Sequence, residues 1–105
     1  MGLQEKILSL MKGIDDPAMR MEVFRSIQFL FEVYTTGEVS EEEILDDLVD
    51  IAATVLSMKH PEKTEEQIME EAKKLAGELM AHFRAETITR RLLAKRRLKR
   101  RELGI

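Results

Sequence analysis

Residues 40–83 read SEEEILDDLVDIAATVLSMKHPEKTEEQIMEEAKKLAGELMAHF and carry the strongest structural signals of the chain. Two capping boxes begin there, at Ser40 and at Thr64, each a hydroxyl residue followed three positions later by Glu or Gln. Between them stands Pro61, which disfavours helical geometry in the residue before it. The segment therefore predicts two helices, one that ends just before Pro61 and one that begins after Thr64.

Apolar residues recur at helical spacing in both predicted helices. At about 100° per residue, each set occupies a single sector of its helix. Acidic side chains cluster on the opposite side of the first helix, so one face is expected to be core and the other solvent. The first apolar set is Ile44, Leu45, Leu48, Ile51, Ala52 and Val55; the second is Ile68, Ala72, Leu75, Ala76, Leu79, Met80 and Phe83.

The N-terminal part of the chain contains signals for two more helices. Asp16 precedes Pro17 as an N-cap precedes the first helical position, and Gly37 is placed to end the helix that they begin. Upstream, residues 3–14 have an amphipathic helical pattern. No alternating apolar run is flanked by hairpin turns. The prediction is an all-α fold, a small helical bundle of four amphipathic helices plus a basic C-terminal helical extension.

The predicted helix that begins at Pro17 is apolar on two sides. A helix of this kind is either central in its bundle or part of a subunit interface. We expect a homodimer formed through the narrower of the two faces, because soluble oligomers favour simple two-fold symmetry. The alternative is that neighbouring helices of the same chain cover both sides. The narrower face consists of Ala18, Phe29 and Val33.

Charge divides the chain into an acidic part and a basic part. Residues 1–83 hold eighteen Asp and Glu against eight Lys and Arg, a net charge of −10, whereas residues 84–105 hold nine Lys and Arg against two Glu, a net charge of +7. A chain of 105 residues has the usual size of one domain. We expect an acidic helical bundle domain over residues 1–86 and a basic C-terminal helix or tail over residues 87–105.

The apolar phase of the last predicted helix fails in the basic end. If the helix continued, Ile88 and Leu92 would point roughly opposite to Ile68 and Leu79. Residues 87–103 are therefore either a separate fifth helix or the outer half of a continuous helix that packs on something else.

The basic end is expected to bind a polyanion, because cations this dense repel one another within a helix. Nucleic-acid phosphates are the favoured partner, DNA or RNA, since arginine forms paired hydrogen bonds to phosphate. No Asn, Gln or aromatic residue follows Ile88, so binding is expected to be largely independent of base sequence. The alternatives are docking on an acidic protein surface, a solvated tail and a helix at a membrane surface. The expected contacts are Arg90, Arg91, Lys95, Arg96, Arg97, Lys99, Arg100 and Arg101.

An enzymatic function would depend on the carboxylates. One predicted helix carries four of them on one face: Glu43, Asp46, Asp47 and Asp50. They resemble half of the Mg²⁺ site of all-helical nucleotide pyrophosphohydrolases of the MazG type, which implies a Mg²⁺-dependent nucleotide hydrolase as a third alternative. The preceding helix supplies two isolated glutamates rather than a matching acidic pair, and there are no cysteines. Neither His60 nor His82 has partners that complete a ligand set. We therefore expect a non-enzymatic binding protein with no cofactor and no metal site.

The remaining features of the sequence concern the protein's environment. Asn is absent, Gln occurs three times and charged residues make up 35%, a bias reported for proteins of thermophiles. The N-terminus lacks the apolar core of a signal peptide, and no apolar run approaches the roughly 20 residues that span a bilayer. We expect a cytoplasmic protein of a thermophilic source, with no association with membranes.

Overall fold

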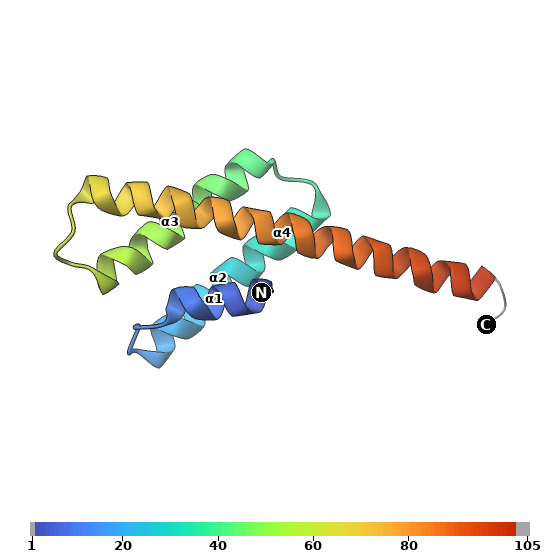
Figure 1. Ribbon diagram of the computed structural model, residues 1–105, viewed down its shortest axis with the longest axis horizontal. Helices are drawn as coiled ribbons and strands as arrows, with labels where there is room; N and C mark the ends of the chain where they lie inside the picture. Colours follow the sequence, from blue (N-terminus) through green and yellow to red (C-terminus); the bar gives the residue numbers. More distant parts are fainter. Residues whose placement is uncertain (1, 103–105) are drawn as a thin grey trace.

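The computed structural model describes residues 2–102, and the side chains of residues 2–97. These residues form four helices and no strand, so the predicted all-α bundle is confirmed. In chain order the helices are α1 (Leu3–Met11), α2 (Pro17–Thr36), α3 (Glu41–Lys59) and α4 (Glu65–Glu102). The most extensive helix pair is α3 with α4, which run antiparallel, and α2 contacts each of the other three helices (Figure 1).

Side-chain caps fix where the helices begin, as the sequence predicts. At the start of α2, Oδ1 of Asp16 accepts a hydrogen bond from the backbone N–H of Ala18 at 3.0 Å. At the start of α4, the backbone N–H of Thr64 donates to Oε1 of Gln67 at 3.0 Å, and the Gln67 N–H donates to the Thr64 hydroxyl at 3.2 Å. Helix α2 ends at Gly37, whose φ of 74° lies in the left-handed region that glycine adopts without strain.

The cap of α3 gives the first testable prediction. The Ser40 hydroxyl accepts a hydrogen bond from the backbone N–H of Glu43 at 3.2 Å. Replacing Ser40→Ala is expected to lower the free energy of unfolding by about 1 kcal/mol, because an N-terminal amide loses its partner. Ser57→Ala is the matched control, since the exposed Ser57 hydroxyl only donates to the carbonyl of Ala53 within α3. Urea denaturation followed by circular dichroism measures both changes, and equal losses would contradict the capping role.

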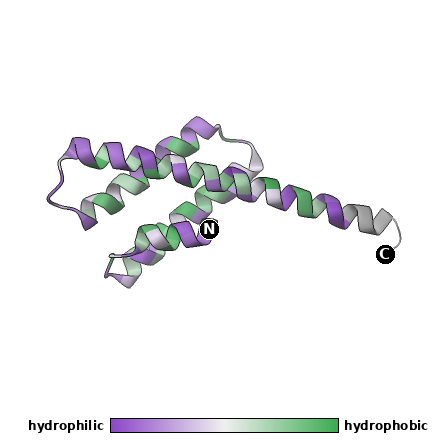
Figure 2. Ribbon diagram, in the orientation of Figure 1, coloured by the Kyte–Doolittle hydropathy of each residue, from purple (hydrophilic) through white to green (hydrophobic). Residues whose placement is uncertain are grey.

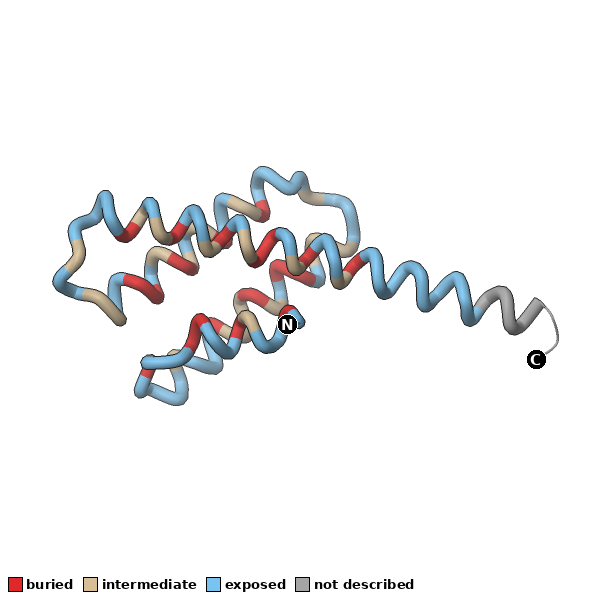
Figure 3. Tube along the Cα trace, in the orientation of Figure 1, coloured by how far each residue is buried: buried red, intermediate tan, exposed pale blue. Residues whose placement is uncertain are grey.

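The core lies where the helices face one another, and Figure 3 shows buried residues recurring along their inner sides. At its centre the ring of Phe83 in α4 lies 5.2 Å from that of Phe31 and 5.9 Å from that of Tyr34, centroid to centroid, both in α2. This aromatic cluster holds α4 against α2. Most members of the predicted apolar faces of α3 and α4 are buried; the half-buried ones are Leu45, Ile51 and Leu75.

Two lysines fasten α1 to the pair of helices α3 and α4. The Lys6 ammonium forms an ion pair with the carboxylate of Glu78 in α4. The Lys59 ammonium of α3 donates a hydrogen bond to the carbonyl of Leu10, and burial lowers the pKa of Lys59 below its ordinary value of 10.5. A helix as short as α1 is marginal alone in water, so these contacts and its buried apolar face hold it in place.

Helix α4 is a single helix of 38 residues. Of the two arrangements predicted for the basic end, the described residues adopt the continuous helix, and the separate fifth helix is wrong. The physical reason is that no Gly or Pro stands between Arg84 and Glu102, while Ala, Leu, Arg, Lys and Glu in that segment are all strong helix formers. When the apolar residues move to another side of a helix, the side that is buried changes, but the helix itself does not have to end.

Residues 88–102 of α4 extend beyond the other helices, and we call them the arm (Figure 1). Helices α1, α2 and α3 and the first part of α4 are called the body. Thr87 is the last buried residue of the described chain, and every side chain from Ile88 to Arg97 is exposed. The radius of gyration of 16.5 Å exceeds the roughly 13 Å expected of a compact chain of this length. The described side chains of the arm, from Ile88 to Arg97, are therefore open to solvent.

Candidate nucleic-acid interface

The arm concentrates positive charge away from the acidic body. Four of its cationic side chains are exposed, and among the described side chains no carboxylate lies within 4.0 Å of any of them. Their charge is thus uncompensated by ion pairs within the described part of the chain. These four, here called the arm cations, are Arg91, Lys95, Arg96 and Arg97. The side chains of the other predicted contacts Lys99, Arg100 and Arg101 lie outside the described residues.

Arg90 is held against the body, unlike the arm cations. Its guanidinium lies 4.8 Å from the centroid of the Phe31 ring, within the range of a cation–π interaction. Its nitrogens also lie 3.9 Å from Oε1 of Glu32 and 3.8 Å from Oε1 of Glu86. The sequence shows that Glu86 and Arg90 lie one turn apart on the same helix, but it does not show that Arg90 contacts α2. Arg90 is therefore a cation of the arm that contacts the body, and it is not counted among the arm cations.

An apolar stripe runs along the arm beside the cations. Ile88 and Leu92, one helical turn apart, are each 57% exposed, and Leu93 at the edge of the stripe is 48% exposed. Figure 2 shows apolar and hydrophilic residues interleaved along this part of α4. The stripe faces away from the buried side of α4, in the direction that the helical spacing predicts. We call Ile88 and Leu92 the arm stripe.

The predicted interface residues of α2 differ in their surroundings. Ala18 is exposed, and Phe29, at 67% exposed, is the most exposed of the large hydrophobic side chains that the structure describes. Val33 is half-buried and packs against the core. Helices of the same chain therefore cover Val33 in part, whereas they leave Phe29 open.

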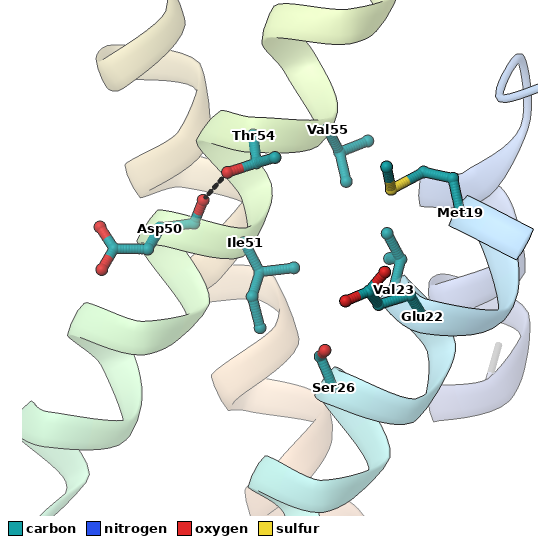
Figure 4. A pocket seen from close by; sticks show the side chains of 8 residues that line it. All are labelled: Met19, Glu22, Val23, Ser26, Asp50, Ile51, Thr54 and Val55. Atoms are coloured by element: carbon teal, nitrogen blue, oxygen red, sulfur yellow. Dashed lines mark hydrogen bonds between the residues drawn. The ribbon is translucent and has the colours of Figure 1, made fainter.

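A groove lies between α2 and α3, and Glu22 in its lining lies two helical turns from Phe29 on one face of α2. The groove encloses about 320 Å³. Figure 4 shows the Glu22 carboxylate directed into the gap between the helices, whereas the Asp50 carboxylate points outward from α3. The Thr54 hydroxyl is occupied by the bond that it donates to the Asp50 carbonyl at 2.9 Å. The groove thus combines apolar walls with one carboxylate directed into it, and Asp50 lies at its α3 edge. Its lining is Met19, Glu22, Val23, Ser26, Asp50, Ile51, Thr54 and Val55.

Three polar side chains join α2, α3 and α4 near the base of the arm. The Arg84 guanidinium donates to both carboxylate oxygens of Glu41, at 3.1 and 2.8 Å, and the Tyr34 hydroxyl donates to Oε1 of Glu41 at 3.1 Å. The hydrogen bonds from Arg84 lower the pKa of Glu41 below its ordinary value of 4.5. Burial, together with the bond to Glu41, raises the pKa of Tyr34 above 10.0. The cluster links the three helices where the arm begins, and sequence reasoning missed it.

Acid is expected to weaken this cluster. Because the folded-state pKa of Glu41 is lowered, the ion pair stabilises the fold fully above the ordinary pKa of 4.5, and the stabilisation is lost as pH falls through the lowered value. The Tm should therefore decrease as pH falls from about 5 to about 3. Arg84→Gln should lower the Tm at neutral pH and flatten this decrease, because it removes the main cause of the shift. Calorimetry across the pH range measures both, and parallel profiles for the two proteins would contradict the assignment.

The carboxylates of α3 that resemble half of a Mg²⁺ site face solvent: Glu43, Asp46, Asp47 and Asp50 are all exposed. Within residues 2–102, no group of three or more His, Cys, Asp or Glu side chains is gathered closely enough to hold a metal ion. Nδ1 of His60 lies 3.3 Å from Oε1 of Glu62, its neighbour in the loop between α3 and α4. His82 is half-buried on α4.

Comparison with protein-family models, with curated proteins and with solved structures gives no significant match to this chain. None of the helices in the described residues combines the length and the apolar composition required to cross a bilayer.

Proposed function

We propose that this chain is a small non-enzymatic binding protein that self-associates through its helical body and holds the backbone of nucleic acid through its arm. The observation that carries the proposal is the set of arm cations, exposed on a helix that extends beyond the body and without a carboxylate partner among the described side chains. Phosphates along a polymer are the natural complement to cations spaced along a helix.

The composition of the arm favours contacts with phosphates over contacts with bases. Arginine predominates, and its planar guanidinium forms paired hydrogen bonds to phosphate oxygens. The arm has no amide side chain to pair with adenine and no ring on which an unpaired base could stack. We therefore propose binding that is largely insensitive to base sequence, with DNA or RNA as the polymer.

Self-association supports this function through avidity. When one arm of a dimer has bound a polymer, the second arm is held close to the same polymer, so the dimer binds more tightly than a single arm does. The exposed Phe29 on α2 supports an interface on the body, because burying a large apolar side chain against a partner lowers the free energy of the complex. A homodimer has the simplest symmetry that provides two arms.

Titration of a labelled DNA duplex and of a labelled RNA with the full chain, at several salt concentrations, tests the proposal. If about six phosphates are neutralised, the logarithm of the affinity should fall with the logarithm of salt concentration at a slope near −5. Two duplexes of unrelated sequence should bind alike. An absence of binding to DNA and RNA at low salt would refute the nucleic-acid function.

A second candidate is an assembly module whose arm docks on an acidic surface of another protein. The exposed arm stripe favours it, because Ile88 and Leu92 lie beside the cations and nucleic-acid phosphates cannot cover apolar side chains. Refutation of nucleic-acid binding in the titration would favour this function.

The amino-acid composition bears on the source and the location of the protein, whichever of the two functions it has. The absence of Asn, the low content of Gln and the abundance of charged residues support a thermophilic source, and we propose a cytoplasmic location.

A further inference from the structure

Two exposed apolar surfaces bear on association, and neither is covered by a described side chain. One is the arm stripe, Ile88 and Leu92, each 57% exposed. The other is the side of α2 that carries Phe29 and borders the groove between α2 and α3. Phe29 lies one helical turn from Ser26, which lines the groove, and two turns from Glu22 on the same face of α2, so the open ring lies next to the groove.

Charge makes these two surfaces complementary. Lys95 and Arg96 follow directly after the arm stripe, and both are exposed without a carboxylate partner among the described side chains. Glu22, whose carboxylate is directed into the groove, and Asp50, at its α3 edge, likewise form no ion pair with any described side chain. Apolar contacts combined with charges of opposite sign are common in protein interfaces.

The arm cannot reach the groove of its own chain. Helix α4 continues without a break in the direction away from the body, as Figure 1 shows, and its stripe faces away from the side that packs on α2 and α3. Pairing of two arms through their stripes is also disfavoured, because it would bring the arm cations of both copies together. The groove of a second copy avoids both obstacles.

We propose that the arm stripe of one copy docks on Phe29 and the α2/α3 groove of a second copy, and that the second copy returns the same contact. The inference rests on the self-association in the proposed function and identifies its two surfaces. Reciprocal docking closes the assembly as a two-fold dimer, whereas unreciprocated docking would continue into a filament. Arg97 lies about 140° around the helix from Leu92, so the docked arm still presents it outward for phosphate.

A charge-reversal experiment tests this arrangement with full-length chains. The groove-reversed chain carries Glu22→Lys and Asp50→Lys, and the arm-reversed chain carries Lys95→Glu and Arg96→Glu. Each alone sets like charges against each other in the proposed contact, so its dimer dissociation constant should rise at least about tenfold over that of the wild type. When the two chains are mixed, both reciprocal contacts regain opposite charges, and a heterodimer should form. Sedimentation velocity on nuclease-treated protein measures the species.

A matched control is the chain with Glu66→Lys and Glu70→Lys, two exposed residues of α4 that form no ion pair with a described side chain. It carries the same change in net charge as the groove-reversed chain and should dimerise like the wild type. A further variant, Ile88→Ser with Leu92→Ser, removes apolar surface that is already exposed. It should weaken the dimer about tenfold or more without lowering the Tm of the monomer, measured at low protein concentration.

The outcomes separate the inference from the proposed function. A mixture that stays monomeric at concentrations where the wild type dimerises overturns the docking of arm on groove. A groove-reversed chain that dimerises like the wild type also overturns it, and leaves self-association through another surface of the body. A monomeric wild type at about 0.1 M salt would remove both the docking and the self-association, while the salt titration with DNA and RNA tests the nucleic-acid half independently.

Discussion

Neutralising the four arm cations to glutamine is expected to weaken binding of a DNA duplex to the monomeric chain, in which Lys95 and Arg96 are not docked on a second copy, by between three and four decades at 0.1 M salt. Each phosphate contact contributes about 0.9 to the slope of log affinity against log salt, so four lost contacts reduce the slope by about 3.6. Extrapolated from 1 M salt, where the electrostatic contribution vanishes, this difference corresponds to between three and four decades of affinity at 0.1 M. Fluorescence anisotropy at several salt concentrations measures both the affinity and the slope.

The matched control neutralises four exposed cations of the body in the same way. They form no ion pair with any described side chain, so their replacement changes the net charge equally without breaking a contact. The control should keep most of the affinity and the slope of the wild type. Equal losses in the two variants would mean that net charge, and not the arm, governs binding. The control residues are Arg20, Arg25, Lys73 and Lys74.

The sequence predicts the helices of the body well because their boundaries depend on local chemistry. Asp16, Ser40 and Thr64 each cap a helix through a hydrogen bond to a backbone amide two or three residues away. Gly37 supplies a left-handed residue that needs no distant partner. Such signals lie within a few residues of their effect, so one sequence is sufficient to identify them.

The candidate site was predicted only in part, because much of it depends on which helices become neighbours. The sequence identifies the arm cations by composition and the exposed direction of Ile88 and Leu92 by helical spacing. It groups Arg90 with the free cations, although contacts to Phe31 and Glu32 of another helix hold it on the body. Helical spacing describes one helix at a time and contains no information on such neighbours.

The groove and the cluster at the base of the arm were missed for the same reason. Glu22 and Asp50 come from two helices, and they border one groove only because α2 and α3 pack together. Tyr34, Glu41 and Arg84 come from three helices. The break in apolar phase after residue 84 indicates the change from buried to exposed surroundings, but it does not reveal whether the helix itself ends.

Phe83→Ala is expected to lower the free energy of unfolding by about 3–5 kcal/mol, a large part of the 5–15 kcal/mol typical of a small domain. Phe83 is fully buried, and its ring contacts those of Phe31 and Tyr34, so truncation leaves a cavity between α4 and α2 that rigid helices cannot close. The matched control is Phe29→Ala, which removes the same atoms from a side chain that is 67% exposed and should change stability by less than about 0.5 kcal/mol.

Urea denaturation at low protein concentration measures both phenylalanine variants on the monomer, which keeps stability separate from association. At high concentration the same Phe29→Ala chain should dimerise more weakly than the wild type, because Phe29 belongs to the proposed docking surface. The two phenylalanines thus separate folding from assembly: one should affect stability at every concentration, and the other only the dimer. A large loss of monomer stability in Phe29→Ala would show that its ring supports the fold itself, and its exposure could then no longer be used as an argument for a partner.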